Sequence, residues 1–321
     1  MAKSEMALRD SFNRKIEYAR VSVTDRCNLR CCYCMPKGMP ACAKPSDLLS
    51  REEIIRFLKV ANRFGLSKIR LTGGEPLLRK DIVDIVRSVK GIGIGDVSLT
   101  TNGFLLPPLA LDLKKAGLNR VNISLDTMYP DRYRIITGGG SLDKVFEAIH
   151  AAEQAGLAPV KINMVPIRGI NDDEILSFAG LSFDKPYHVR FIELMPVGEE
   201  AWSKKRRVTA FEVMRTISKM GELTPLGRSG SSDNYRLKGA RGVIGFISPM
   251  SNHFCDRCNR IRITARGKLK TCLFSGNEVD LRGIDTEEEL ERILVLSVWN
   301  KPRGRLFQPA LPLEAMSAIG G

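Results

Sequence analysis

The sequence is poor in histidine and contains no long apolar run. Only 3 of its 321 residues are histidine. His150, His188 and His253 lack the spacing of a metal site or a catalytic triad, so a histidine-based hydrolase has no support. No apolar stretch approaches the length of a membrane span. No apolar stretch of the kind found in signal peptides follows Met1–Lys3. We therefore expect neither membrane insertion nor export.

Acidic residues are also scarce compared with basic ones. The chain has 36 Asp and Glu against 50 Lys and Arg, which gives a formal net charge of +14. Such an excess is typical of proteins that bind nucleic acid, acidic proteins or polyphosphates, although a basic solvated surface produces it too. The basic run at 204–207 favours a solvated loop. Gly138-Gly-Gly140 lacks the Lys-Ser/Thr of a P-loop and predicts a turn.

Cysteine is the residue that carries the most information. Cys27, Cys31 and Cys34 form a Cys-x3-Cys-x2-Cys run whose thiolates can hold three of the four irons of a cubane iron–sulfur cluster. Clusters that only carry electrons are normally held by four cysteines, so the vacant iron indicates a cluster that does chemistry. Cys32 and Cys42 do not fit this spacing. Eight cysteines without a signal peptide are better explained as reduced thiols or metal ligands, which predicts a cytoplasmic protein.

Strand and helix patterns alternate along the first two thirds of the chain. Ser50-Arg-Glu-Glu53 is a capping box that opens a helix with an apolar face. Further helices are expected at 81–89, 108–116, 142–155 and 172–179. Six strands are expected at 18–24, 68–71, 97–100, 120–125, 160–165 and 189–194. Six strand–helix units predict an α/β fold, an incomplete (βα)6 barrel of parallel strands with an open side.

Polar residues follow these strands at the edge where barrel enzymes keep their active sites. The second strand leads into Gly73-Gly74-Glu75-Pro76, and the third into Thr100. The Gly-Gly pair lets a ligand approach the backbone, and Glu75 can accept hydrogen bonds from a bound ammonium. The later strands contribute Ser124, Asp126, Lys161, Asn163, Arg190, Glu193 and Met195. Because these polar residues are all expected at the same edge of the sheet, beside the cysteine loop, the sequence predicts that they form one site.

The cysteine run together with Gly73-Gly74-Glu75-Pro76 resembles the radical S-adenosylmethionine superfamily. The resemblance implies that the methionine amino and carboxylate groups chelate the open iron. It also implies that an electron from the cluster cleaves S-adenosylmethionine into methionine and a 5′-deoxyadenosyl radical. The alternative for the cysteines alone is a structural zinc knuckle.

A second cysteine group, Cys255-x2-Cys258-x13-Cys272, lies near the other end of the chain. Taken alone it favours zinc, with His253 as a possible fourth ligand. The surrounding sequence, from Phe254 to Phe274, is similar to the GTP 3′,8-cyclases of molybdenum-cofactor biosynthesis (the MoaA type). That similarity runs from about Phe12 to the terminal Gly320-Gly321. It implies a second [4Fe–4S] cluster with an open iron, where the guanine of GTP binds.

The resemblance assigns roles to matching positions. Cys27, Cys31 and Cys34 would hold the first cluster, and Cys255, Cys258 and Cys272 the second. S-adenosylmethionine would contact Tyr33, Gly74, Glu75, Ser124 and Met195. The GTP pocket would comprise Arg20, Lys68, Arg70, Thr100, Lys161, Arg190, Arg260, Ile261 and Arg262. Arg260 and Arg262, with the first three cysteines, are the catalytic candidates. Forked arginine donors suit phosphate oxygens, which accounts for the basic charge.

The implied reaction is the cyclisation of GTP to (8S)-3′,8-cyclo-7,8-dihydroguanosine 5′-triphosphate, started by removal of the ribose 3′ hydrogen. Its cofactors are S-adenosylmethionine and two [4Fe–4S] clusters. The expected partners are an electron donor and the downstream cyclic pyranopterin monophosphate synthase. We expect no binding to a membrane or to nucleic acid, and a protein that is a monomer or a homodimer. We expect a core at 1–240 and a C-terminal region at 241–321 that closes the barrel mouth. Two alternatives stay open: a peptide-modifying radical enzyme and a zinc-stabilised nucleic-acid-binding module.

Overall fold

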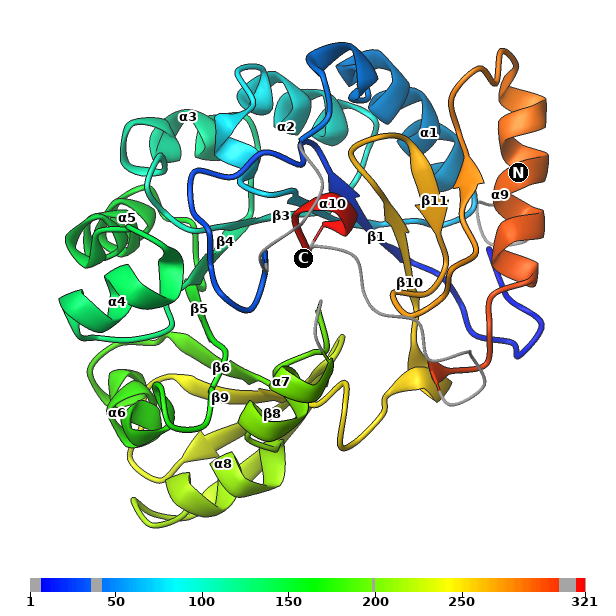
Figure 1. Ribbon diagram of the computed structural model, residues 1–321. Helices are drawn as coiled ribbons and strands as arrows, with labels where there is room; N and C mark the ends of the chain where they lie inside the picture. Colours follow the sequence, from blue (N-terminus) through cyan, green and yellow to red (C-terminus); the bar gives the residue numbers. More distant parts are fainter. Residues whose placement is uncertain (1–6, 36–41, 198–199, 306–315, 321) are drawn as a thin grey trace.

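A computed structural model of the protein describes residues 7–35, 42–197, 200–305 and 316–320. The named strands in these residues belong to one twelve-stranded sheet with the order β12-β11-β10-β1-β2-β3-β4-β5-β6-β9-β8-β7. Figure 1 shows the sheet curving around an open interior. Within the described part of the chain the edge strands β12 and β7 do not pair with each other, so the barrel is incomplete.

The six parallel strands that the sequence predicts form the middle of the sheet, each within two residues of its expected bounds. This confirms the expected α/β partial barrel. The strands are β1 (Tyr18–Ser22), β2 (Lys68–Thr72), β3 (Asp96–Thr101), β4 (Arg120–Ser124), β5 (Lys161–Met164) and β6 (His188–Ile192).

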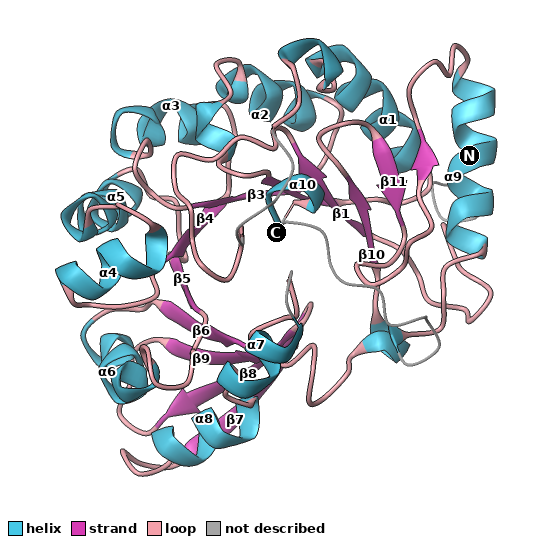
Figure 2. Ribbon diagram, viewed as in Figure 1, coloured by secondary structure: helices cyan, strands magenta, loops and turns pink. Residues whose placement is uncertain are grey.

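Helices cover the outer face of this sheet (Figure 2). They are α1 (Arg51–Arg63), α2 (Ile82–Gly91), α3 (Ala110–Lys115), α4 (Pro130–Thr137), α5 (Leu142–Gln154) and α6 (Ile175–Asp184). The sequence did not predict α4. It begins with proline, which suits the first helical position, and ends at Gly138 with a φ of 70°. Gly138 is therefore part of a turn, as expected.

The start of α1 shows how the sequence sets a helix boundary. Ser50 accepts a hydrogen bond from the N–H of Glu53, and the Glu53 carboxylate accepts one from the N–H of Ser50. This reciprocal cap satisfies two backbone donors that the first turn leaves free. The buried face of the helix includes Ile54, Phe57 and Leu58, which pack in the core. The predicted capping box is confirmed.

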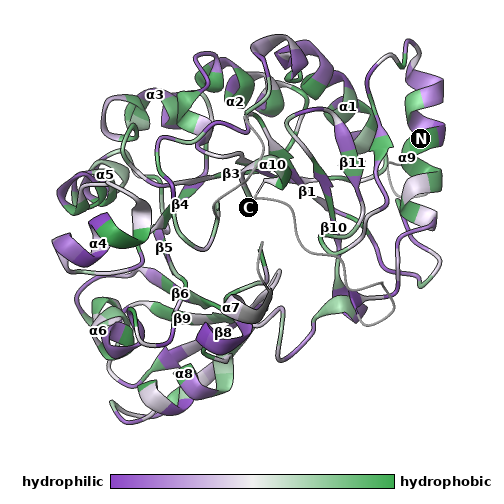
Figure 3. Cartoon of the chain, viewed as in Figure 1, coloured by the Kyte–Doolittle hydropathy of each residue, from purple (hydrophilic) through white to green (hydrophobic). Residues whose placement is uncertain are grey.

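Alternation along the strands decides what faces the interior. In β1, Ala19 and Val21 belong to the hydrophobic core between sheet and helices, whereas Arg20 between them lines the interior cavity. The same alternation in β2 puts Ile69 in the core and Arg70 in the cavity. Figure 3 shows hydrophobic and hydrophilic residues interleaved along these elements. Alternation along the strands thus places apolar side chains between the sheet and the helices, and polar side chains in the interior cavity.

The C-terminal part of the chain extends both edges of the same sheet. Next to β6 it adds β9 (Val243–Ile247), β8 (Ser232–Leu237) and β7 (Leu223–Ser229). Next to β1 it adds β10 (Arg260–Ile263), β11 (Lys268–Lys270) and β12 (Val279–Asp280). The connection from β9 to β10 crosses the open side of the sheet (Figure 1) and contains Cys255 and Cys258, whereas Cys272 follows β11. The division of the chain at residue 240 stays a prediction.

Four more α-helices belong to the described structure. They are α7 (Glu200–Arg206), α8 (Ala210–Ile217), α9 (Glu287–Trp299) and the short α10 (Met316–Ile319) in the tail. Most of the basic run at 204–207 is therefore helical, and the expectation of a loop there is wrong. Within the described residues, no helix combines the length and the apolarity needed to cross a membrane.

Candidate active site

A cavity of about 290 Å³ lies inside the curved sheet, at the carboxyl ends of the parallel strands. Both cysteine groups, strand-end residues and the C-terminal tail contribute to its wall. Most of the predicted site residues line it: Arg20, Cys27, Cys31, Tyr33, Cys34, Arg70, Gly74, Thr100, Ser124, Arg190, Met195, Cys255, Cys258, Arg260, Arg262 and Cys272. Residues from the two ends of the sequence therefore share one space.

The loop that carries the first cysteine group is anchored to the end of α4. The backbone N–H groups of Arg30 and Cys32 donate to carbonyls in the last turn of that helix at 2.8 and 2.9 Å. This anchoring leaves Cys27, Cys31 and Cys34 facing the cavity, while Cys32 is exposed and outside its lining. The loop thus separates three cysteines that can share a ligand from one that faces solvent.

The first three thiols suit a group larger than a single ion. In the described residues, no three His, Cys, Asp or Glu side chains are placed to hold one metal ion. Cys27, Cys31 and Cys34 nevertheless line one cavity and influence one another electrostatically. Burial, followed by Cys27 and Asp126, raises the pKa of Cys34 to about 12. Three soft ligands spread around one space fit a [4Fe–4S] cluster, whose binding releases their protons.

The Gly-Gly-Glu-Pro segment after β2 packs directly against the start of the cysteine loop. A Cβ on Gly74 would lie 2.2 Å from the carbonyl oxygen of Arg26, so no other residue fits without a shift. Glu75 is fully buried and does not line the cavity. Its carboxylate accepts hydrogen bonds from the N–H groups of Leu77 and Asn102 and from the Thr101 hydroxyl. Burial raises the pKa of Glu75 to about 7, against these hydrogen bonds.

Tyr33 connects the cysteine loop to the strands. Its hydroxyl donates to Asp126 Oδ2 at 2.7 Å, and Asp126 Oδ1 accepts from the N–H of Val165 at 2.9 Å. Burial raises the pKa of Asp126 to about 6, although both hydrogen bonds act against it. Ser124 and Met195 line the cavity nearby. This half of the cavity therefore combines the first cysteines with an acidic group.

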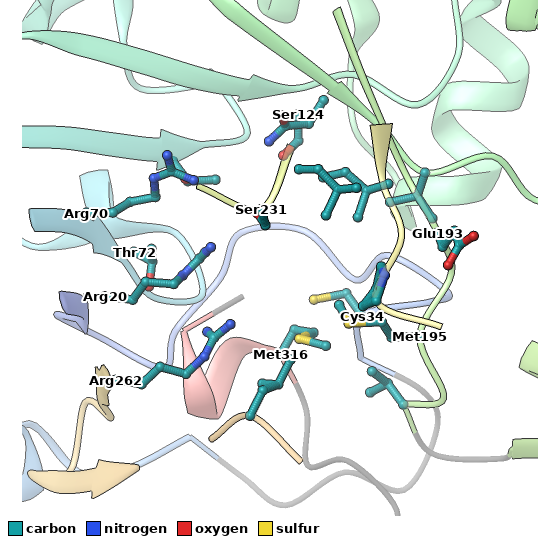
Figure 4. A pocket seen from close by; sticks show the side chains of 18 of the residues that line it. Arg20, Cys34, Arg70, Thr72, Ser124, Glu193, Met195, Ser231, Arg262 and Met316 are labelled. Carbon is teal, nitrogen blue, oxygen red and sulfur yellow. The ribbon is translucent and has the colours of Figure 1, made fainter. Parts of the chain in front are cut away.

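A row of arginines forms the opposite half. Register pairs Arg20 with Arg70 on one side and with Arg262 on the other, so the three side chains project from neighbouring strands. Figure 4 shows them across the cavity from Cys34, Glu193 and Met195. Burial, and then Arg260, lowers the pKa of Arg262 to about 10. Burial, and then Arg262, lowers that of Arg20 well below its usual value. Such a concentration of buried cations suits a polyanionic ligand.

Several buried polar atoms around the cavity lack a hydrogen-bond partner in the described structure. They include the hydroxyls of Thr72 and Thr100, Oδ1 of Asn163 and Nε of Arg190, and all four residues line the cavity. Buried polar groups are normally satisfied, so these atoms indicate a polar ligand. The other end of Arg190 is fixed, since its Nη2 donates to Asn122 Oδ1 at 2.6 Å.

Three predicted GTP contacts lie outside the cavity lining. Lys68 forms an ion pair with Asp96 at 3.1 Å. The Ile261 side chain is fully buried on the opposite face of β10. Burial, followed by Arg190 and other nearby cations, lowers the pKa of Lys161 to about 7. Their roles in binding stay predictions.

The second cysteine group lies in a cationic environment. Cys255, Cys258 and Cys272 line the cavity as free thiols. Burial raises the pKa of Cys258, but Lys301 and Arg260 outweigh it and lower the pKa to about 6. His253, the proposed fourth zinc ligand, also lines the cavity. Three thiols facing one space again fit a cluster with an open iron.

The C-terminal tail enters this site. Arg262 Nη1 donates to the carbonyl of Gly320 at 2.7 Å, and the N–H of Met316 donates to the carbonyl of Cys34 at 3.3 Å. A Cβ on Gly320 would lie 2.5 Å from the Thr72 hydroxyl. Residues 316–320 therefore lie in the site, whereas Gly321 lies outside the described residues.

Some lining residues had no assigned role. Asp126, Asn163 and Glu193 were visible in the sequence as polar residues at strand ends. Asp126, through its charge, and Asn163, through its unsatisfied Oδ1, are ligand candidates. The Glu193 carboxylate instead accepts hydrogen bonds from the N–H groups of Ala210, Met250 and Ser251. Ser231, in the turn between β7 and β8, and Met316 carry no local signal. Ser231 comes here through the pairing of β8 with β9 and of β9 with β6, and Met316 through the path of the tail.

Comparison with protein families defines the class of this fold and site. Residues 21–181 match the Radical SAM superfamily, and residues 187–307 match Molybdenum Cofactor Synthesis C. The two matches include the first and the second cysteine group, respectively.

Relatives that match over their whole length narrow the class. The chain is 50% identical to the GTP 3′,8-cyclase of Moorella thermoacetica and 47% identical to that of Thermodesulfovibrio yellowstonii. Each match covers 98% of this chain and 100% of the relative. The chain therefore belongs to the radical SAM superfamily and, within it, to the family of the GTP 3′,8-cyclases.

Solved structures support the fold. Streptococcus suis SuiB bound to S-adenosylmethionine aligns with a TM-score of 0.65 at 15% identity, over 89% of this chain and 68% of SuiB. Methylornithine synthase aligns with a TM-score of 0.52 at 21% identity, over 64% of this chain and 63% of that structure. At these identities the likeness shows the shared architecture.

Proposed function

We propose that this protein is a GTP 3′,8-cyclase. It is a radical S-adenosylmethionine lyase that converts GTP to (8S)-3′,8-cyclo-7,8-dihydroguanosine 5′-triphosphate, the first step of molybdenum-cofactor biosynthesis. The observation that carries the proposal is the division of one cavity into two halves, each with three cysteines, one acidic and one rich in arginine. Full-length relatives with this activity in their names support it.

The acidic half suits S-adenosylmethionine. Its sulfonium group is cationic, and Asp126 lines this half. Cys27, Cys31 and Cys34 would hold the cluster whose open iron it chelates, and Tyr33 fixes Asp126 through its hydroxyl. When bound and reduced by one electron, S-adenosylmethionine supplies the 5′-deoxyadenosyl radical that removes the ribose 3′ hydrogen.

The arginine half suits the triphosphate of GTP. Arg20, Arg70 and Arg262 present guanidinium groups from neighbouring strands, and forked donors can bind several phosphate oxygens at once. Cys255, Cys258 and Cys272 would hold the second cluster, where the guanine binds. The ribose would then lie between the two halves, within reach of the radical.

The chain's own contribution is therefore to position the reactants and to shield the radical. A cavity enclosed by the sheet, the β9–β10 connection and the tail limits access of water and other quenchers. Holding both substrates at fixed positions lowers the barrier that two freely diffusing molecules would face. We also propose a cytoplasmic location, an external electron donor, the downstream cyclic pyranopterin monophosphate synthase as a partner, and a monomer or homodimer.

The decisive experiment is anaerobic reconstitution of the protein with iron and sulfide, reduction, and incubation with S-adenosylmethionine and GTP. Mass analysis should detect 5′-deoxyadenosine together with the cyclised nucleotide in equal amounts. Release of 5′-deoxyadenosine without loss of GTP would mean that GTP is not the substrate. GTP-independent modification of a peptide would favour the alternative radical enzyme.

A further inference from the structure

Lys301 is a buried cation at the second cysteine group. It follows α9 and is only 2% exposed. Its ammonium donates to the carbonyl oxygen of Arg260 at 2.9 Å and to that of Thr271. Thr271 directly precedes Cys272, and Arg260 lies two residues after Cys258. One side chain therefore joins the two segments that carry these cysteines.

Two other buried cations in this region have carboxylate partners, whereas Arg262 faces the cavity and donates to the carbonyl of Gly320. Arg14 is 8% exposed and forms an ion pair with Asp10 at 2.5 Å. Lys270 is 4% exposed and forms an ion pair with Glu278. Lys301, in contrast, forms no ion pair with a carboxylate among the residues that the structure describes, and both of its acceptors are neutral carbonyls. Among the described residues, no carboxylate therefore compensates its charge.

A buried ammonium without a counter-charge is unfavourable, because neutral carbonyls solvate it but do not cancel its charge. The cysteines nearest to its two acceptors along the chain are Cys258, two residues before Arg260, and Cys272, directly after Thr271. A [4Fe–4S] cluster held by three thiolates carries net negative charge, and reduction adds one more electron. Such a cluster is the counter-charge that this position lacks.

We propose that Lys301 is the charge partner of the second iron–sulfur cluster. Its two hydrogen bonds hold the cysteine segments in place, and its positive charge stabilises the cluster, above all in the reduced state. The inference rests on the proposed function, in which Cys255, Cys258 and Cys272 hold that cluster. It predicts that removing the charge lowers the reduction potential of this cluster and weakens its retention.

The test uses the full chain with the first site removed by Cys27→Ser, Cys31→Ser and Cys34→Ser, so that only the second cluster contributes. After anaerobic reconstitution, iron and sulfide per chain are measured, and the midpoint potential is followed by electron paramagnetic resonance. Lys301→Gln keeps a hydrogen-bond donor but loses the charge. We expect about a tenfold lower ratio of reduced to oxidised cluster at fixed potential, a shift of about 59 mV for one electron.

Two further variants separate charge from structure. Lys301→Arg keeps the charge and should keep the wild-type potential. The double variant Lys270→Met with Glu278→Gln removes an ion pair whose two charges cancel, near the same cysteines. It should leave the reduction potential nearly unchanged. An unchanged potential in Lys301→Gln with full iron content would overturn the proposal. So would loss of the fold in Lys301→Gln before any cluster is added, because Lys301 would then be a structural donor.

The chain that carries the three cysteine substitutions of the first site and an unchanged Lys301 tests the proposed function separately. If the chain with an intact Lys301 binds no iron at Cys255, Cys258 and Cys272, the assignment of the second cluster fails and the role of Lys301 fails with it. If that chain binds iron normally and Lys301→Gln behaves identically, only the role of Lys301 fails.

Discussion

The two cysteine groups face one cavity from opposite electrostatic surroundings. Burial and neighbouring anions raise the pKa of Cys34 to about 12, whereas Lys301 and Arg260 overcome burial and lower that of Cys258 to about 6. Asp126 belongs to the first half, and Arg262 belongs to the second. The two halves therefore suit ligands of opposite charge, which in the proposed function are a sulfonium on one side and a triphosphate on the other.

The largest expected effect comes from removing one cysteine of the first group. Cys27→Ser should abolish cleavage of S-adenosylmethionine, because the cluster loses a ligand. Cys272→Ser should instead mainly damage GTP binding and turnover. Release of 5′-deoxyadenosine measures the first effect, and equilibrium binding of GTP measures the second. Cys32→Ser is the matched control, since Cys32 lies outside the cavity lining and should keep full activity. Normal cleavage by Cys27→Ser contradicts the division of roles.

The second effect separates assembly of the two clusters. Gly74→Ala puts a Cβ 2.2 Å from the Arg26 carbonyl, so the first cysteine loop must shift. Iron content should fall from about eight to about four per chain, because the second group is not touched. Gly95→Ala meets nothing within 4 Å and serves as the control. Equal loss of iron from both groups would show that the halves assemble together.

A smaller effect is expected on the cationic side. Arg262→Ala removes one charged donor from the proposed triphosphate site and should raise the Kd for GTP roughly 10- to 100-fold. Binding of S-adenosylmethionine should stay close to wild type. Arg257→Ala is the control, because Arg257 is exposed and absent from the cavity lining. A comparable loss of S-adenosylmethionine binding in Arg262→Ala would break the proposed division of the cavity.

The smallest effect concerns stability and pH. The pKa of Lys161 falls from 10.5 to about 7 on folding, since burial and nearby cations disfavour its charge. The unfolded chain therefore binds more protons between these values, and this group makes stability rise with pH across that interval. Lys161→Met should raise the Tm of the ligand-free protein by a few degrees at pH 7, and this gain should shrink toward pH 10. Thermal unfolding at several pH values checks it, and a pH-independent difference contradicts it.

Local patterns were sufficient for the parallel core. The period of the apolar residues and the Ser50–Glu53 cap predicted the six strands and α1 because these depend on neighbours in sequence. The helix α4 was missed because its eight residues bury few side chains. Local patterns could not predict the pairing of β10 with β1. Tyr18 and Arg260 are far apart in the sequence and become neighbours only in the folded sheet.

Motifs located the site, but not the partner of each atom. The spacing of the cysteines and the Gly-Gly-Glu-Pro segment marked the region correctly. No sequence pattern indicates that the Glu75 carboxylate accepts hydrogen bonds from neighbouring backbone and hydroxyl groups away from the cavity. In the same way, nothing in the residues around Lys301 distinguishes it from an exposed lysine. Such distinctions depend on which surfaces the fold buries.

The pairing of β10 with β1 also has a consequence during synthesis. Until Arg260 emerges from the ribosome, β1 has β2 on one side and an unpaired edge on the other. An open strand edge is a site of aggregation, and a nascent chain carries it through most of its elongation. Both cysteine groups then face each other only after the last third of the chain has arrived. Chains truncated before β10 should therefore accumulate as insoluble protein, whatever the state of their first cysteine loop.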